Sequence, residues 1–419
     1  MGEDRPGRRP DGEFGADLPA VLVVCALVYL LDGLVHSIMG PIAPAVETSL
    51  SLSHAELGPI FSANLIGQLF GLILFPLLAS KIGNRKVVIV TATGFGVFQV
   101  ASGFAGTGNL LFATRLMTGV FLGGALPTCL AMVSAVAPPH RRGLVITALF
   151  TGYGMGATIA GLVVGIFGVG SWRAAMIAIG ACCLATAVLA WLWLGRRSPE
   201  AGPDRSEGIG GTLNPLAVLA PRLLVGTLAL WLLFICMLTI SYCLFSWLPI
   251  LLVDVGYDPS IAAISVTTFS FGGIVAALGV GLLIDRFGAL PVLIGFLVIS
   301  TVMLFGIGQI LASASPATLL ILLGVCGFFL LGAYGGVNVV LASHYPEAIR
   351  AIGIGWTKSV GRVGTILAPI LIGFALSNGV SETTVMSLFA LPAGLATFAL
   401  VIIGLTERRE RPAALTAAE

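Results

Sequence analysis

The sequence predicts an all-α polytopic membrane protein, in which twelve transmembrane helices form two parallel repeats of six helices. Three observations predict this fold class. Of the 419 residues, 57% are hydrophobic and only 10% are charged, whereas a typical soluble domain carries about 25% charged residues. The chain contains twelve long apolar stretches, and its two halves share similar loop sequences. A soluble enzyme, a nucleic-acid-binding protein and a disordered scaffold are therefore excluded.

Each apolar stretch approaches or exceeds the roughly 20 residues that a helix needs to cross a bilayer. The first six cover residues 18–42, 57–80, 87–105, 109–135, 143–168 and 172–195. The last six cover residues 222–253, 260–284, 290–313, 317–343, 350–376 and 382–405. The first stretch is too long for a cleaved signal region, so we expect it to be a retained span. All seven cysteines lie inside apolar stretches without metal-ligand spacing, so we expect no metal site, disulfide or cofactor.

One long polar segment divides the spans into two sets of six. It contains Ser-Pro, Gly-Pro and Gly-Gly pairs, which are typical of a linker. The predicted domains are a tail at 1–17, a six-helix bundle at 18–195, a linker at 196–221, a second six-helix bundle at 222–405 and a tail at 406–419.

The distribution of Lys and Arg predicts the orientation. With the N-terminus inside, 17 of the 21 cations lie in cytoplasmic segments, and the outer loops keep only Arg173. Cytoplasmic loops of membrane proteins carry an excess of Lys and Arg. We therefore expect a multi-pass protein of the cell (plasma) membrane, the bacterial inner membrane, with both termini in the cytoplasm.

The two halves repeat each other at equivalent loops. Leu77-Leu78-Ala79-Ser80-Lys81-Ile82-Gly83 follows the second span, and Leu282-Leu283-Ile284-Asp285-Arg286-Phe287-Gly288 follows the eighth, 205 positions later. Pro139-His140-Arg141-Arg142-Gly143 and the set Pro346, Arg350 and Gly353 stand at a second equivalent pair of loops. Parallel repeats of this kind are found in transporters that hold their substrate near the midplane, between the halves.

Several sequence stretches resemble the major facilitator superfamily and, within it, the aromatic acid:proton symporter family. They are Leu31-Asp32-Gly33, Thr114-Arg115-Leu116-Met117-Thr118-Gly119, Ser246-Trp247-Leu248-Pro249, Asp285-Arg286-Phe287-Gly288, Tyr345-Pro346-Glu347-Ala348-Ile349-Arg350-Ala351-Ile352-Gly353-Ile354-Gly355-Trp356 and Gly361-Arg362-Val363-Gly364. The resemblance covers residues 18–405. It implies the major facilitator fold and proton-coupled uptake of a hydroxybenzoate-type acid. The chain departs from the family at Val35 and Ser80, where an acid is usual, and in carrying Lys358.

Charged residues at membrane depth indicate, independently of the family resemblance, what charge the substrate carries. Away from the span ends, the chain has Asp32, His36, Arg115, Lys358 and Arg362. Such residues are costly in a bilayer and usually mark substrate pathways or proton relays. Without the histidine the formal sum is +2, and this surplus of cations favours an anionic ligand. The residues therefore predict an organic anion as substrate.

Asp32 and His36 are the candidate proton-coupling residues. They are four positions apart, so they share one face of the first helix. Asp32 and Arg115 are expected at similar depths, which leaves two interpretations open: a structural salt bridge, or a protonatable carboxyl group whose charge responds to an arriving anion. His36 titrates near neutral pH, although a lone histidine in a helix is more often a packing residue. His54, His140 and His344 lie near span ends and support no comparable argument.

Candidate substrate-binding residues lie in both halves. Arg362 is expected near the midplane and has the fork geometry that binds a carboxylate. Lys358, one turn earlier, is either a second anion contact or a side chain that reaches the cytoplasmic interface. The full predicted set is Arg115, Arg362, Lys358, Tyr334, Asn338, Trp247 and Tyr242. Core packing and the interfacial belt also account for aromatic residues in membrane helices.

The two repeated loops are predicted to form a cytoplasmic gate. Its residues are Lys81, Gly83, Arg85, Asp285, Arg286 and Gly288. The first loop has Ser80 in place of an acid, so we expect the gate to be weakened in the first repeat and intact in the second.

The predicted function is that of a secondary active transporter, which takes up an organic anion with protons by alternating access and works as a monomer. A proton-driven efflux antiporter for drugs or metabolites is the alternative, although Gly152-Tyr153-Gly154-Met155-Gly156 lacks the proline typical of those antiporters. A primary pump would need a phosphate-binding loop that the sequence lacks. We expect no catalytic residues, because the membrane interior offers one acid and one histidine.

Overall fold

The computed structural model describes residues 14–137, 142–168, 170–194, 215–346 and 349–416. This part of the chain is helical, and twelve of its segments are long and apolar enough to cross a membrane. The predicted fold class is confirmed. Most of the predicted tail 1–17 and of the linker 196–221 lies outside the described residues. The short helix η2 (Pro215–Leu219) precedes the second half.

The first half consists of α1 to α7. Their bounds are Phe14–Ser37, Met39–Leu50, His54–Ile82, Asn84–Gly103, Gly108–Val136, Arg142–Phe167 and Trp172–Trp193. The second half consists of α8 to α14. Their bounds are Leu224–Asp254, Pro259–Phe287, Ala289–Ile310, Pro316–His344, Arg350–Ser377, Glu382–Leu388 and Ala390–Thr416. The last helix continues beyond residue 405, where the predicted bundle ends.

Two of the predicted spans are interrupted, and proline explains both interruptions. The first span divides at Ile38 into α1 and α2, and the last divides at Phe389 into α13 and α14. Pro41 and Pro392 lack the N–H groups that would bond the carbonyls of Ser37 and Leu388, so the regular ladder fails at these points. The break after α1 comes directly after Asp32 and His36.

Both halves use the same helix packing. In the first half, α3 packs on α5, α4 on α7 and on α5, and α1 on α6; in the second half, the equivalent pairs are α9 with α11, α10 with α14 and with α11, and α8 with α12. Close approach depends on glycine at matching positions. A Cβ on Gly67 would collide with the backbone of Leu116, and a Cβ on Gly272, 205 positions later, would collide with the backbone of Gly324. Small residues allow such contact between membrane helices.

The repeated loops also share a backbone conformation. Gly83 joins α3 to α4 with φ 87° and ψ 150°, and Gly288 joins α9 to α10 with φ 84° and ψ 153°. Only glycine adopts this region without strain. The glycine in each loop therefore has a structural reason, independent of any role in a gate.

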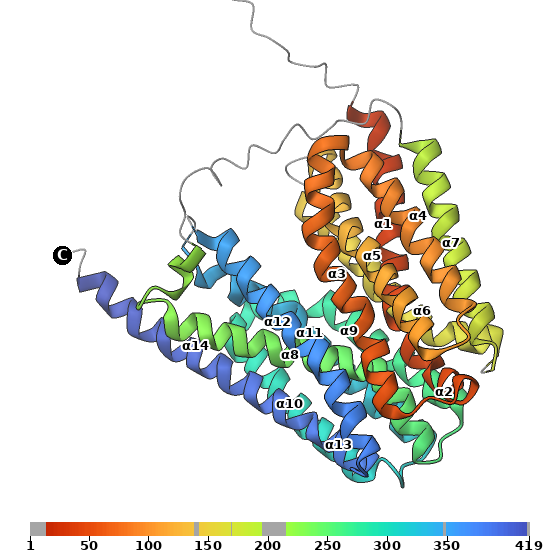
Figure 1. The fold of residues 1–419 in the computed structure, drawn as a ribbon. Coiled ribbons are helices and arrows are strands. Elements are labelled where there is room, and N and C mark those ends of the chain that lie inside the picture. Colours follow the sequence, from red (N-terminus) through yellow and green to blue (C-terminus); the bar gives the residue numbers. More distant parts are fainter. Residues whose placement is uncertain (1–13, 138–141, 169, 195–214, 347–348, 417–419) are drawn as a thin grey trace, which may run out of the picture.

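The halves meet mainly through α3 with α12, α6 with α9, and α2 with α8 and α9. Their hydrogen bonds concentrate at one end: Ala55 N–H donates to Ser377 Oγ (2.9 Å), Ser62 Oγ to the Ile366 carbonyl (2.7 Å), and Thr267 Oγ1 to the Thr158 carbonyl (2.9 Å). We call this the closed end. The halves lie together there, beside α2 and α13, and spread apart toward the diverging end, where α3 ends and α12 begins (Figure 1).

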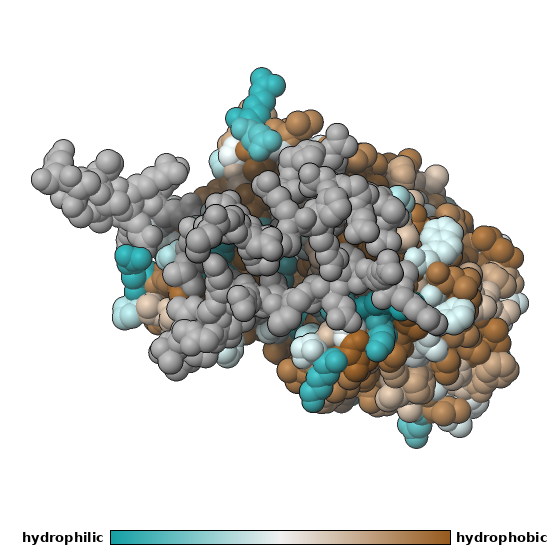
Figure 2. All heavy atoms as spheres, turned by 90° about the horizontal axis from the view of Figure 1, so that it is seen from above, coloured by the Kyte–Doolittle hydropathy of each residue, from teal (hydrophilic) through white to brown (hydrophobic). Residues whose placement is uncertain are grey.

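The outer surface is apolar, as a lipid-facing surface requires. Exposed large hydrophobic side chains are spread along helices of both halves, among them Ile73, Leu278, Val302 and Phe374. The space-filling view onto the diverging end shows a flank that is largely brown, with a few teal side chains around it (Figure 2). The low charge content of the sequence thus agrees with the apolar character of the visible flank.

Candidate functional site

The candidate site begins with a buried carboxyl group. Asp32 lies in the last turns of α1 and is 1% exposed. Neither of its carboxylate oxygens has a hydrogen-bond donor among the described residues. Burying an ionised carboxylate without donors costs several kcal/mol or more. This position therefore favours either a protonated carboxyl group or a nearby positive charge.

Arg362 supplies that charge from the other half of the molecule. It lies on α12, and its guanidinium interacts electrostatically with Asp32. Its Nη1 atom donates a hydrogen bond to Oε1 of Gln68 on α3, with a length of 3.1 Å. Within the described residues no other hydrogen bond to this guanidinium occurs, and no carboxylate lies within 4.0 Å of it. Most of its donors can therefore serve a ligand.

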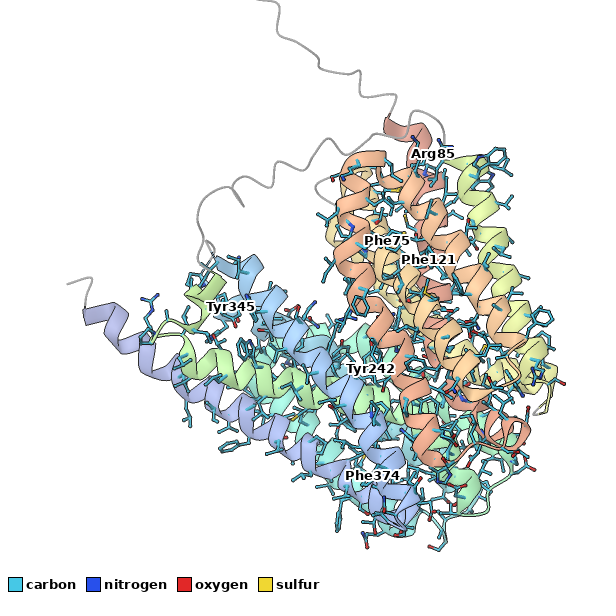
Figure 3. The ribbon with its side chains drawn as sticks, viewed as in Figure 1. Phe75, Arg85, Phe121, Tyr242, Tyr345 and Phe374 are labelled. Atoms are coloured by element: carbon cyan, nitrogen blue, oxygen red, sulfur yellow. The ribbon has the colours of Figure 1, made fainter. Side chains whose placement is uncertain are left out.

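Tyr153 lies near Asp32 because its helix, α6, is in backbone contact with α1. A Cβ on Gly33 would collide with the carbonyl of Tyr153, so glycine beside Asp32 is what lets α6 approach. The side chain of Tyr153 interacts electrostatically with that of Tyr242 on α8. Because Tyr153 and Tyr242 belong to different halves, this interaction lies between the halves, and Asp32 also acts on both tyrosines. Figure 3 shows Tyr242 in the middle of the molecule, where the halves meet.

His36 packs against the two tyrosine rings. Its imidazole lies 4.7 Å from the ring of Tyr242, centroid to centroid, in an edge-on arrangement, and 6.3 Å from the ring of Tyr153. Its Nδ1 atom is buried without a hydrogen-bond partner among the described residues. The aromatic contacts account for its packing, and the free nitrogen leaves it able to accept or donate a proton.

Tyr334 on α11 completes the cluster from the second half. It interacts electrostatically with both Tyr242 and Arg362. Asn338, one turn later, donates through Nδ2 to the carbonyls of Tyr334 and Gly335 in its own helix, at 3.2 Å each. Its amide donor is thus used locally, while Oδ1 remains as an acceptor. We call Asp32, His36, Tyr153, Tyr242, Tyr334 and Arg362 the central cluster.

Lys358 adds a second cation next to the cluster. It lies one turn before Arg362 on α12, and its side chain is exposed. Arg362 is the charge that acts on it. Two cations one turn apart repel each other when no anion lies between them. Lys358 thus remains a candidate for a second anion contact.

Arg115 lies inside the first half. It is 1% exposed, and its Nη1 and Nη2 atoms donate to Oε1 of Gln99 and to the carbonyl of Val35, both at 2.9 Å. The structure contains no Asp32–Arg115 ion pair within 4.0 Å, so the interpretation of these two residues as a structural salt bridge is wrong. Arg115 instead binds the backbone of the last turn of α1, where proline has interrupted the helix. Its direct contact with substrate stays a prediction.

Trp247 lies at the closed end. It is 0% exposed, and its ring packs on Phe61 (centroids 5.1 Å apart) and on His54 (6.1 Å) from the other half. These contacts assign Trp247 to the closure between α3 and α8. Its predicted role as a substrate contact gains no support from this packing.

The predicted gate residues lie at the diverging ends of their helices. Arg85 donates through Nη2 to the carbonyl of Trp191 in its own half (3.3 Å), and Arg286 lies over the ring of Phe287 (5.3 Å). Lys81 and Asp285 are exposed. No hydrogen bond or ion pair between described residues joins the two loops. Their role as a gate, including the predicted difference between the two repeats, stays a prediction.

The arrangement is suited to binding an anion and a proton together. A guanidinium with free donors can bind a carboxylate, three tyrosine rings can pack on an aromatic ring, and Asp32 can carry the proton. Among the described residues, no group of three or more His, Cys, Asp or Glu side chains is placed to hold a metal ion.

Sequence analysis missed two residues of this site. Gln68 is an ordinary polar residue in an apolar span, and only the antiparallel contact of α3 with α12 makes it a partner of Arg362. Tyr153 had a signal, because an aromatic residue between glycines at 152, 154 and 156 indicates a ring held where helices approach closely.

Known proteins are similar to this chain over nearly its whole length. A family model described as Major Facilitator Superfamily matches residues 25–265 and 230–419. The chain is 30% identical over 421 residues to the gallate transporter of Pseudomonas putida, covering 94% of this chain and 93% of that protein. It is 31% identical over 427 residues to the 4-hydroxybenzoate transporter PcaK of Pseudomonas aeruginosa, covering 93% of each. It is 33% identical over 401 residues to the 3-(3-hydroxy-phenyl)propionate transporter of Escherichia coli K12, covering 94% and 96%.

Solved structures share the fold. The nucleoside transporter NupG superposes with a TM-score of 0.73 at 16% identity, covering 92% of this chain and 98% of that one. The D-xylose-proton symporter superposes with a TM-score of 0.72 at 17% identity, covering 92% and 97%. At these identities the likeness concerns the fold alone.

Proposed function

The chain belongs to the Major Facilitator Superfamily, and we propose that it takes up an aromatic carboxylate together with protons, by alternating access of a site between its two halves. Both termini are cytoplasmic in this proposal, so the closed end faces outward and the diverging end faces the cytoplasm. The units that move are the bundles 18–195 and 222–405, joined by the linker 196–221.

The observation that carries the proposal is that Arg362 of the second half acts electrostatically on the buried Asp32 of the first. Within the part of the chain that the structure describes, Asp32 is buried without a donor, and Arg362 has one hydrogen bond, to Gln68. When Asp32 is ionised, its charge competes with a substrate carboxylate for Arg362. When Asp32 is protonated, the guanidinium is free to bind the anion. Binding of the proton and binding of the anion thus favour each other, which is the requirement for symport.

Two observations support an aromatic substrate: the transporters to which this chain is similar, and the tyrosine rings of the central cluster. Transporters of gallate, 4-hydroxybenzoate and 3-(3-hydroxy-phenyl)propionate are similar to this chain over nearly its whole length. The central cluster carries tyrosine rings from α6, α8 and α11, and the tyrosines of α8 and α11 interact electrostatically with the guanidinium. An aromatic ring with a carboxylate at one side and a hydroxyl at another matches these groups, since the hydroxyls of the tyrosines can both donate and accept.

Transport then follows from charge balance. A site with an ionised Asp32 and no anion, or with a protonated Asp32 and an anion, keeps Arg362 neutralised in each case. In these two states, the site can switch from facing one side of the membrane to facing the other at the least electrostatic cost. A protonated Asp32 without an anion leaves Arg362 unneutralised, so uncoupled proton movement is disfavoured.

The test is uptake of radiolabelled 4-hydroxybenzoate into proteoliposomes, with the outside more acidic than the inside. We expect accumulation above the equilibrium level, abolished when the gradient is collapsed by a protonophore. 4-Hydroxybenzyl alcohol, which keeps the ring and hydroxyl but lacks the carboxylate, serves as a matched competitor and should not inhibit. Equal uptake with and without the gradient, or equal inhibition by the alcohol, would contradict the proposal.

A further inference from the structure

A histidine joins the two halves at the closed end, away from the central cluster. His54 is the first residue of α3. Its Nε2 atom lies 3.0 Å from Oε1 of Glu47 on α2 and 3.4 Å from Oδ2 of Asp254 at the end of α8. Glu47 belongs to the same half as His54, whereas Asp254 belongs to the other. Within the described residues, these are the only ion pairs shorter than 4.0 Å.

The position of His54 is held by contacts with the second half. Its ring lies edge-on to Trp247, with centroids 6.1 Å apart and an angle of 82° between the rings. A Cβ on Gly373 of α12 would collide with the backbone carbonyl of His54. The next residue, Ala55, donates its N–H to Ser377 Oγ at 2.9 Å. Separation of the halves at this end would therefore carry His54 away from Asp254.

The charges around His54 are all negative. Glu47 on α2, Asp254 on α8 and Glu382 on α13 act on it electrostatically, and among the described residues no cation acts there. When the imidazole is neutral, the carboxylate of Glu47 in the first half faces those of Asp254 and Glu382 in the second, and the halves repel each other. When the imidazole is protonated, its positive charge lies between them and the sign of the interaction reverses.

We propose that His54 is a second proton-binding group, separate from Asp32, whose protonation stabilises the closed end and whose deprotonation favours its opening. The side chains of His54, Glu47 and Asp254 keep 21%, 25% and 24% exposure, so protons reach the group from the side that the closed end faces. This inference rests on the proposed alternating access, because only a conformational cycle separates His54 from Asp254.

The direction of the pH effect follows from the charges. The closed conformation holds the histidine between carboxylates and binds its proton more tightly than an open conformation, in which Asp254 has moved away. Lowering the pH until His54 is protonated therefore shifts the population toward closure at this end. The same external acid that drives symport would then also favour closure behind the loaded substrate.

The test is a distance measurement by electron paramagnetic resonance across the closed end. Spin labels go on cysteines at Asn109 and Ala312, exposed positions at this end of the first and second halves, in a chain whose seven native cysteines are replaced. From about pH 8 to about pH 5.5, we expect the ratio of closed to open populations to rise about fivefold in nanodiscs. The His54→Gln variant, which keeps a donor but not the charge, should lose this rise.

Three further variants separate His54 from other titrating groups. His54→Lys carries a fixed charge and should stay closed at both pH values. Asp258→Asn removes a neighbouring exposed acid whose carboxylate bonds Ser260 instead, and should keep the full response. Asp32→Asn should also keep it. A full pH response in His54→Gln, or its complete loss in Asp32→Asn, would overturn the inference. Failure of anion uptake in proteoliposomes would instead overturn the proposed function, and leaves this distance measurement interpretable.

Discussion

Arg362 of the second half donates a 3.1 Å hydrogen bond to Gln68 of the first half. It is the innermost of the described hydrogen bonds that run along the antiparallel pair of α3 and α12, after Ala55–Ser377 and Ser62–Ile366. Beyond it the two helices continue toward the diverging end. The guanidinium thus lies at the last of these hydrogen bonds and acts electrostatically on the buried carboxyl of Asp32.

The first prediction concerns the guanidinium itself. Arg362→Gln removes a charge-assisted, two-pronged contact with a carboxylate, which is worth about 1.5–3 kcal/mol. We expect the affinity for 4-hydroxybenzoate to fall about tenfold to a hundredfold in a binding assay on purified protein. Arg362→Lys keeps the positive charge but loses the two-pronged guanidinium, so its affinity for 4-hydroxybenzoate should lie between that of the wild type and that of Arg362→Gln. Wild-type affinity in Arg362→Gln would exclude this residue as the substrate contact.

The second prediction separates Arg115 from Arg362. Arg115→Gln leaves the buried side chain of Gln99 and the carbonyl of Val35 without their donor, and each orphaned group costs about 1–3 kcal/mol. We expect a lower melting temperature in detergent for this variant. Arg362→Gln, the same substitution at the boundary between the halves, should melt near the wild-type temperature. A normal melting temperature for Arg115→Gln, combined with lost binding, would restore Arg115 as a ligand contact.

The third prediction concerns proton coupling at Asp32. Asp32→Asn mimics the protonated carboxyl group permanently and keeps Arg362 free for the anion. We expect this variant to exchange internal for external 4-hydroxybenzoate but to lose accumulation driven by a proton gradient. Asp258→Asn is the matched control, since Asp258 is exposed and caps α9 through Ser260, and it should accumulate normally. Gradient-driven accumulation by Asp32→Asn would make Asp32 a structural residue.

The fourth prediction concerns the tyrosine pair that lies between the halves. Tyr242→Phe keeps the ring beside His36 but removes a hydroxyl that we propose to contact the substrate. A hydrogen bond between this hydroxyl and the substrate would contribute about 0.5–1.5 kcal/mol, so affinity for 4-hydroxybenzoate should fall about threefold to tenfold, while affinity for benzoate, which lacks the hydroxyl, changes less. Tyr345→Phe is the control, because Tyr345 lies near the diverging end of the second half (Figure 3) and contacts Thr357. An equal effect of both variants would argue against ligand recognition by Tyr242.

Much of the fold could be predicted from the sequence because membrane helices must satisfy their own backbone. Apolar length alone located the twelve spans, and the loops ending in Gly83 and Gly288 revealed the repeat. The breaks at Ile38 and Phe389 were not predicted, although Pro41 and Pro392 cause them. Proline has no fixed effect in a membrane helix, since neighbouring groups decide whether the freed carbonyl finds a donor.

The site was predicted in part. Asp32, His36, Tyr242, Tyr334 and Arg362 were identified as rare polar or ionisable groups at depth, and the structure brings them together. Tyr153, Gln68 and His54 were missed, because each gains its partner from a helix of another sequence region. Trp247 was grouped with Tyr242, five positions away, yet the helix turns it toward His54 and Phe61 at the closed end.

The sequence by itself determined the class of protein, the number of spans and the surplus of positive charge at depth, because these depend on composition and on spacing along one chain. Only the tertiary structure decided which charges are partners. Arg115 binds Gln99 and Val35 rather than Asp32, Arg362 reaches Gln68, and His54 lies between Glu47 and Asp254. The physical reason is that such contacts depend on the depth and rotation of whole helices, which are set by glycine-mediated packing between spans far apart in the chain.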